Sequence, residues 1–140
     1  MSRVDFYVLS QPGEQARQLF ACRLAEKAYR LDHTVHIITQ DRAAAERIDD
    51  LLWTFRDGSF VPHHVTDRDG DAERSPVTIG SAAIDGRDLL INLADEIPES
   101  ADTFPRIAEL VTSDEAAKQL SRRRYAAYRD QGHELDTHKV

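Results

Sequence analysis

The sequence has a single cysteine, Cys22, and no apolar run of the roughly 20 residues that a membrane-spanning helix needs. One cysteine cannot form an internal disulfide, which suits a reducing compartment, and Cys22 is interpreted as a small buried residue. The opening MSRVDFYVLSQPG also lacks the apolar core of a signal peptide. We therefore expect a cytoplasmic protein that contacts no membrane.

Glycine-rich phosphate loops are missing as well. The first strand-to-helix turn, SQPGEQAR (10–17), has one glycine and matches neither GxGxxG nor GxxxxGK[ST]. Neighbouring histidines, His33 with His36 and His63 with His64, have spacings that turn strand side chains to opposite faces. The sequence therefore predicts no nucleotide cofactor and no metal site, and nothing in it supports a catalytic activity of its own.

Basic residues are the minority, because 18 Lys and Arg face 25 Asp and Glu and the formal net charge is -7. Such a chain repels DNA phosphate on average, so any nucleic-acid contact would have to be local. The length of 140 residues suits one domain, 1–140, with one sizeable core. We expect this domain to be monomeric when isolated.

Strand and helix patterns alternate from the start of the chain. Short apolar runs predict strands at 5–10, 35–39, 60–65, 77–80 and 89–94. Helical spacing predicts helices at 14–31, at 41–55 with Asp41 as N-cap, at 101–111 interrupted by Pro105, and at about 115–129. Polar residues predict an exposed loop at 66–76 and a tail at 132–140. The β-α-β-α order favours a three-layer, Rossmann-like α/β/α fold with a mostly parallel sheet and no nucleotide-binding loop.

Positive charge is concentrated in the last predicted helix, within SRRRYAAYRDQG (121–132). A helical wheel places Arg123 and Arg124 beside the core face, with their charged ends in water. The core face is predicted from the small and apolar Ala116, Leu120 and Ala127. A separate stripe collects Lys118, Arg122, Tyr125 and Arg129.

Two interpretations of this stripe stay open. It is either a solvated helix face, where the helix dipole favours cations near the C-terminus, or a site for an anionic group. No acidic residue lies between Lys118 and Arg129, so the stripe lacks a salt-bridge partner within that segment. Tyr125 among the charges favours a ligand that has both an apolar and a negative end.

An ordered set of segments carries a resemblance to a known family: DFYVL (5–9), LLW (51–53), SFVPHH (59–64), RDLLINL (87–93) and KQLSRRRYAAYRDQGHEL (118–135). Together they resemble the chi subunit family of the bacterial DNA polymerase III holoenzyme, over nearly the whole chain. The resemblance implies a Rossmann-like fold without nucleotide binding or catalysis, and an accessory role in the clamp-loader complex.

The resemblance also implies two partners. One is the acidic, phenylalanine-ended C-terminal tail of single-stranded DNA-binding protein, for which the implied site is Lys118, Arg122, Tyr125 and, as a wall of the apolar pocket, Val111. A further family position, often lysine, is Ala126 here, and Arg129 or Arg123 would compensate for it electrostatically. DNA would be reached only indirectly, through the tail.

The second implied partner is the psi subunit, and the implied contacts are Trp53, Phe60, Val61, Pro62 and His63. The residues alone leave an alternative open, in which Trp53 packs its helix onto the sheet and Phe60 fills the core. A direct single-stranded nucleic-acid binder that uses the Arg/Tyr stripe is the competing function. The negative net charge and the lack of a second aromatic platform argue against it.

Overall fold

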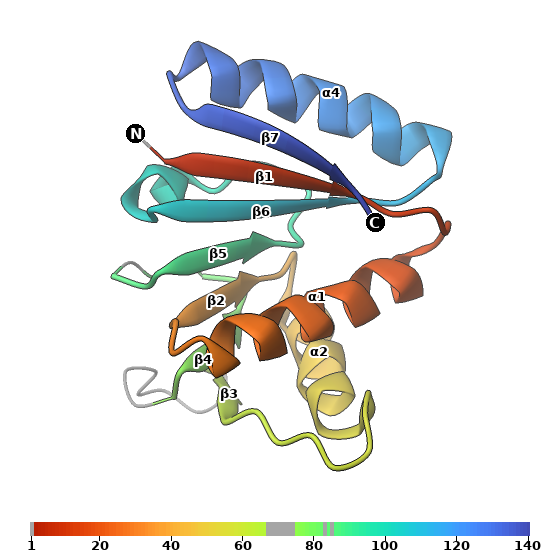
Figure 1. Ribbon diagram of the computed structural model, residues 1–140, viewed down its shortest axis with the longest axis vertical. Helices are drawn as coiled ribbons and strands as arrows, with labels where there is room; N and C mark the ends of the chain where they lie inside the picture. Colours follow the sequence, from red (N-terminus) through yellow and green to blue (C-terminus); the bar gives the residue numbers. More distant parts are fainter. Residues whose placement is uncertain (1, 67–74, 83, 85) are drawn as a thin grey trace.

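Seven parallel strands form one sheet in the order β3-β4-β2-β5-β6-β1-β7 (Figure 1). The computed structural model describes residues 2–66, 75–82, 84 and 86–140, so most of the predicted 66–76 loop lies outside the described residues. The strands are β1 (Arg3–Val8), β2 (Val35–Ile38), β3 (His63–Val65), β4 (Val77–Gly80), β5 (Leu89–Asn92), β6 (Arg106–Val111) and β7 (Glu134–Lys139). The helices of the described residues are α1 (Glu14–Arg30), α2 (Arg42–Thr54), η1 (Glu99–Thr103, a 3-10 helix) and α4 (Glu115–Asp130).

Two cores lie on the two faces of the sheet. Successive residues of β2, Ile37 and Ile38, belong to different cores, because side chains alternate along a strand. The first core packs under α1 and α2, and the second contains Tyr128 of α4 and Phe104. The sheet therefore lies between two helical layers, which confirms the expected three-layer α/β fold.

The helices cover the two faces unequally. α1 packs mainly on β2 and β6 and α2 on β3 and β4, whereas α4 packs on β6 and β7 at the other edge (Figure 1). On β1, Val4 and Phe6 point to the α4 core, so Asp5 and Tyr7 point to the opposite face. That part of the face lies beside α1, and it carries polar side chains.

Local signals placed the first helices correctly. The Asp41 carboxylate accepts a hydrogen bond from the Ala44 N–H at 2.8 Å, which confirms it as the N-cap of α2. Cys22 is fully buried, as expected, and burial raises the pKa of its thiol to about 12. A thiol held protonated in this way is a packing group and not a nucleophile.

The predicted helix at 101–111 is wrong. Residues 99–103 form the short η1, and 106–111 form β6, which pairs with β5 and β1 near the centre of the sheet. Both faces of β6 are buried, so its sequence RIAELV shows no clean alternation and reads equally well as helical spacing.

The expected polar tail is a strand. β7 pairs in parallel with β1 along six residues, from Arg3 opposite Glu134 to Val8 opposite Lys139. A polar sequence suits this position because β7 lies at the edge of the sheet, where charged side chains discourage further pairing.

Candidate binding surfaces

The core face of α4 differs from the wheel's prediction. Leu120 is 44% exposed and Ala116 is exposed, whereas Tyr128 is fully buried and the Arg124 side chain is only 13% exposed. Arg124 therefore does not hold its charged end in water, as the sequence suggested. The helix is turned so that Arg124 and Tyr128, one turn apart, face the sheet.

A buried carboxylate on β6 explains this rotation. Glu109 accepts hydrogen bonds from the Tyr128 hydroxyl at 2.7 Å, the Asn92 amide at 2.8 Å and the Arg124 guanidinium at 3.2 Å. Burial raises the pKa of the Glu109 carboxyl, and the charge of Arg124 and these hydrogen bonds oppose that rise. A charge inside an apolar strand needs such partners, so polar residues of α4 take core positions.

A groove lies between α4 and the strands β1 and β7. It has a volume of about 230 Å³, and its apolar floor is made by Phe6, Val8 and the ring of Tyr125, which lies 5.4 Å from the ring of Phe6. Arg122 and Arg129 line the same groove, together with Ser121, Ala126 and Thr137. We call this the arginine groove.

The arginine groove brings together three of the five residues assigned to the tail site: Arg122, Tyr125 and Arg129. Sequence reasoning missed Phe6, Val8 and Thr137. The alternation of β1 would have put Phe6 and Val8 on one face, but nothing local in the tail indicated that Thr137 would lie beside them.

Val111 lies in a second groove, on the other side of Ser121. Val111 is buried there at the end of β6 and lines the groove with Leu120 and Arg124. Ser121 lines both grooves, so they are neighbours across α4. Lys118, the remaining tail-site residue, is part-exposed on α4 but is not among the lining residues of the arginine groove.

The arginines of the stripe do have acidic neighbours at the two ends of α4. Arg122 lies 3.9 Å from Glu115, and Arg129 lies 3.5 Å from Asp130. All four side chains are largely exposed, and exposed pairs of this kind stabilise a protein by at most about 1 kcal/mol. The guanidinium groups can therefore exchange these contacts for a ligand at little cost.

At the opposite edge of the sheet, three rings form an aromatic cluster, Trp53, Phe60 and His63, in which Trp53 and Phe60 are exposed and the His63 side chain is buried. Trp53 is 54% exposed and Phe60 63% exposed, and their ring centroids lie 5.8 Å apart. The His63 ring lies 4.7 Å from Trp53, and its Nε2 lies 3.1 Å from the Asp49 carboxylate. The alternative in which Trp53 packs its helix onto the sheet and Phe60 fills the core is therefore wrong, because both side chains are more than half exposed.

The other two residues assigned to the psi surface differ in exposure. Pro62 is half-buried, but Val61 is buried in the first core. Val61 anchors the segment that carries Phe60 on one side and His63 on the other, and it does not present its side chain at the surface.

A cluster of possible metal ligands lies on the neighbouring strands β1 and β7. One ligand atom each from Asp5, Asp136 and His138 lies within 4.8 Å of the others. Arginines already pair with both carboxylates, Arg106 with Asp5 at 2.8 Å and Arg3 with Asp136. The cluster is thus an ion-pair network on β1, β6 and β7, and a cation would have to displace guanidinium groups from it.

The fold and surfaces define a class: a parallel α/β protein with exposed charged and aromatic surfaces at its two edges. In the described part of the chain, no helix is both long and apolar enough to cross a membrane. The family model described as DNA polymerase III chi subunit, HolC, matches residues 1–136. The chain belongs to this family.

Curated relatives agree over essentially full length. The chain is 42% identical to DNA polymerase III subunit chi of Pseudomonas aeruginosa, covering 100% of this chain and 98% of the relative. It is 36% identical to the Haemophilus influenzae subunit, with 97% and 96% covered, and 32% identical to that of Escherichia coli, with 98% and 97% covered.

Among solved structures, the crystal structure of T4 UvsW resembles the chain with a TM-score of 0.69 at 10% identity. The match covers 99% of this chain but 41% of that one. At this identity the likeness concerns the fold alone.

Proposed function

We propose that the protein is a non-catalytic adaptor of the DNA polymerase III clamp-loader complex. In this proposal it binds the acidic tail of single-stranded DNA-binding protein at α4 and the psi subunit at the aromatic cluster. Membership of the chi family supports it. The observation that carries it is the placement of the two surfaces, beside β7 and beside β3, at the two ends of the strand order.

This placement separates the partners. A sheet of seven strands has six gaps of about 4.8 Å, so the two surfaces lie roughly 29 Å apart. Both partners would then bind at once without touching each other at these sites, which is what a link between them needs.

The arginine groove suits the end of an acidic tail that finishes in phenylalanine. The ring would pack on Tyr125 and Phe6, and the α-carboxylate would pair with Arg122, whose planar guanidinium can bind both oxygens. Arg129 lines the same groove and stands near the position where Ala126 replaces the family's usual cation. Its charge would restore the missing attraction for acidic residues.

In this proposal, Lys118 and Val111 act on the tail from outside the arginine groove. Lys118 would attract the acidic residues that precede the phenylalanine, which raises the association rate more than the final affinity. Val111 would contact the tail only where it crosses α4 at Ser121, because Val111 belongs to the neighbouring groove. Binding should be weak, exchangeable and salt-sensitive, since a short tail buries little area.

The psi contact is proposed for the aromatic cluster. Exposed aromatic side chains that touch one another are typical anchors of protein interfaces, and Trp53 and Phe60 form such a pair. The buried His63 ring would support Trp53 through its own contact with that ring. Pro62 stiffens the segment between Phe60 and His63, which lowers the conformational entropy lost on binding. Val61 would hold this segment from beneath.

Two titrations test the proposal. The first compares a tail peptide, the same peptide without its final phenylalanine, and a bare single-stranded oligonucleotide. Loss of binding with the phenylalanine supports the adaptor, whereas tight oligonucleotide binding that ignores the deletion supports a nucleic-acid binder instead. The second follows anisotropy of a labelled tail peptide as psi is added: a further rise supports simultaneous binding, and release of the peptide contradicts it.

A further inference from the structure

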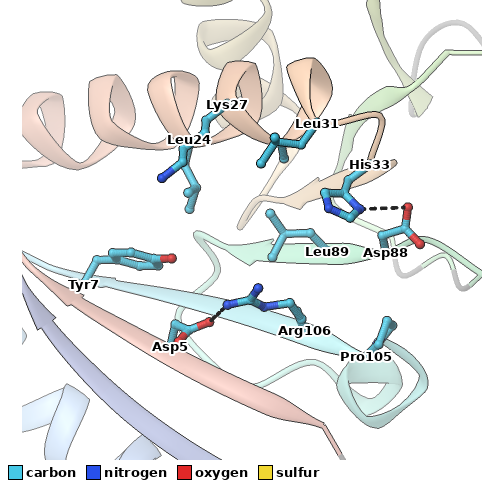
Figure 2. A pocket seen from close by; sticks show the side chains of 11 residues that line it. Asp5, Tyr7, Leu24, Lys27, Leu31, His33, Asp88, Leu89, Pro105 and Arg106 are labelled. Atoms are coloured by element: carbon cyan, nitrogen blue, oxygen red, sulfur yellow. Dashed lines mark hydrogen bonds and ion pairs between the residues drawn. The ribbon is translucent and has the colours of Figure 1, made fainter.

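A second cavity lies between α1 and the sheet, on the face opposite α4 (Figure 2). It has a volume of about 440 Å³, within the range of about 300–1,000 Å³ typical of small-molecule sites. Neither the arginine groove nor the aromatic cluster shares a lining residue with it. From its lining, we propose that this cavity binds a small organic carboxylate with an apolar body.

Apolar side chains make the middle of the cavity. Leu24 and Leu31 come down from α1 and its C-terminal end, and Leu89 rises from β5 (Figure 2). Leu31 is exposed, although it is a large aliphatic residue at the mouth of a cavity. Covering this side chain would remove apolar surface from water, so a ligand with an apolar body gains free energy here.

Cations gather at one end of the cavity. Lys27 of α1, Arg106 of β6 and the Tyr7 hydroxyl of β1 line this end (Figure 2). Across residues 2–66, 75–82, 84 and 86–140, no carboxylate pairs with Lys27. Burial, and then the charge of Asp5, raise the pKa of the Tyr7 phenol, so it stays a neutral hydrogen-bond donor at physiological pH.

The two carboxylates of the lining already have donors. Asp5 contacts Arg106 at 2.8 Å, His138 at 2.9 Å and Arg3 at 3.4 Å. At the other end of the cavity, Asp88 accepts from the backbone N–H of Thr34 at 2.9 Å and lies 3.7 Å from His33. The hydrogen-bond donors that remain for a ligand therefore belong to Lys27, Arg106 and Tyr7. These donors favour a ligand whose acceptor atoms carry negative charge.

One negative charge fits better than two. Asp5 and Asp88 both line the cavity, and they would repel a phosphate dianion more strongly than a carboxylate. A planar carboxylate also matches the fork of a guanidinium, which Arg106 can present beside Lys27. The carboxylate end would thus lie at Lys27 and Arg106, and the apolar body would lie along Leu31 and Leu89.

Phenylacetate, an apolar ring that carries a carboxylate, is a suitable probe of this cavity. Changes in the backbone amide chemical shifts show where it binds. We expect phenylacetate to move the ¹H–¹⁵N signals of Ala28, Leu31 and Leu89 in a saturable way. Phenylacetamide, which has the same body without the charge, should move them at least ten-fold more weakly. Inorganic phosphate, which has charge without the body, should also leave them nearly unmoved. Equal shifts with the amide, or saturable shifts with phosphate alone, would overturn the proposal.

Variants separate this cavity from the arginine groove. Lys27→Gln should weaken phenylacetate at least ten-fold at these amides, while Arg30→Gln, on the same helix but outside the lining, should leave the affinity unchanged. Among the residues that the structure describes, Lys27 has no ion pair to lose, so the variant should fold, and its melting curve checks this. Unchanged affinity in Lys27→Gln, or shifts confined to Tyr125 and Ala126, would contradict the assignment.

The carboxylate can come from a free acid or from the last residue of a peptide. A short peptide that ends in phenylalanine with a free carboxylate, titrated against the Arg122→Ala variant, distinguishes these sources. Shifts at Ala28 and Leu89 as strong as those from phenylacetate would point to a peptide end. Shifts from phenylacetate alone would point to a free acid, and both results support a carboxylate site.

Discussion

The ring of Tyr125 on α4 lies 5.4 Å from the ring of Phe6 on β1. This contact closes the floor of the arginine groove, since Phe6 itself is buried and Tyr125 is partly exposed. It joins residues that are far apart in the sequence, and it gives a cationic helix an apolar surface beside its guanidinium groups.

Tyr125→Ala should weaken tail-peptide binding by about 2 kcal/mol, roughly 30-fold, because it removes the exposed half of the groove floor. Tyr125→Phe keeps the ring and is the matched control. Fluorescence anisotropy with a labelled tail peptide measures both. Equal losses in the two variants would mean that the hydroxyl, and not the ring, makes the contact.

Arg122→Ala should abolish most tail binding and leave the fold intact, because its side chain is largely exposed and its ion pair to Glu115 is 3.9 Å long. Arg123→Ala is the control, since Arg123 is also exposed on α4 but does not line the groove. Calorimetric titration and thermal melting check binding and folding. Normal tail binding by Arg122→Ala would refute the site.

Phe60→Asp should release the psi subunit and keep the tail, because it puts a charge into the aromatic cluster at the other edge of the sheet. Co-purification with psi and peptide anisotropy give the two readouts. Val61→Asp is the contrasting variant: Val61 is buried in the core, so we expect it to unfold the protein and to lose both partners.

Arg124→Ala should destabilise the protein by about 3 kcal/mol, because it leaves the Glu109 carboxylate buried without its cation. The double variant with Glu109→Gln should recover part of this loss, since the amide carries no charge. Urea denaturation measures the free energies of unfolding. A double variant that is less stable than Arg124→Ala alone would show that the pair is not the source of the effect.

The environment of Asp5 predicts that the protein becomes less stable in acid. Burial alone would raise the pKa of its carboxyl, but hydrogen bonds from His138 and Arg106, and the charges of Arg106 and Arg3, hold it below its ordinary value of 3.8. A lowered folded-state pKa adds stability above the unfolded-state value, and this is lost as pH falls through the folded-state value. Stability should therefore drop as the pH falls below about 4, the ordinary range of an aspartate carboxyl.

Asp5→Asn should be less stable than the parent at neutral pH and should show a shallower fall between about pH 4 and pH 2. Denaturant unfolding across this range measures the slope. Asp130→Asn, an exposed carboxylate at the end of α4, is the control and should keep the parental slope. A parental slope in Asp5→Asn would contradict the prediction.

Local sequence determined much of this protein. The first two helices, the Asp41 cap, strand β4 and the stripe of Arg122 and Tyr125 all follow from short-range periodicity and capping, which the backbone imposes within a few residues. The absence of phosphate-binding glycines is likewise a property of the sequence. The family resemblance, carried by segments along the whole chain, was confirmed by the family match.

Only the tertiary structure decided the rest. Parallel strands pair across long stretches of sequence, so neither the central β6 nor the polar edge strand β7 could be identified from its own residues. Glu109, buried on β6, turned α4 so that Arg124 and Tyr128 face inward and Leu120 outward. The arginine groove exists because β7 lies beside β1 beneath that rotated helix, a long-range arrangement that no local pattern contains.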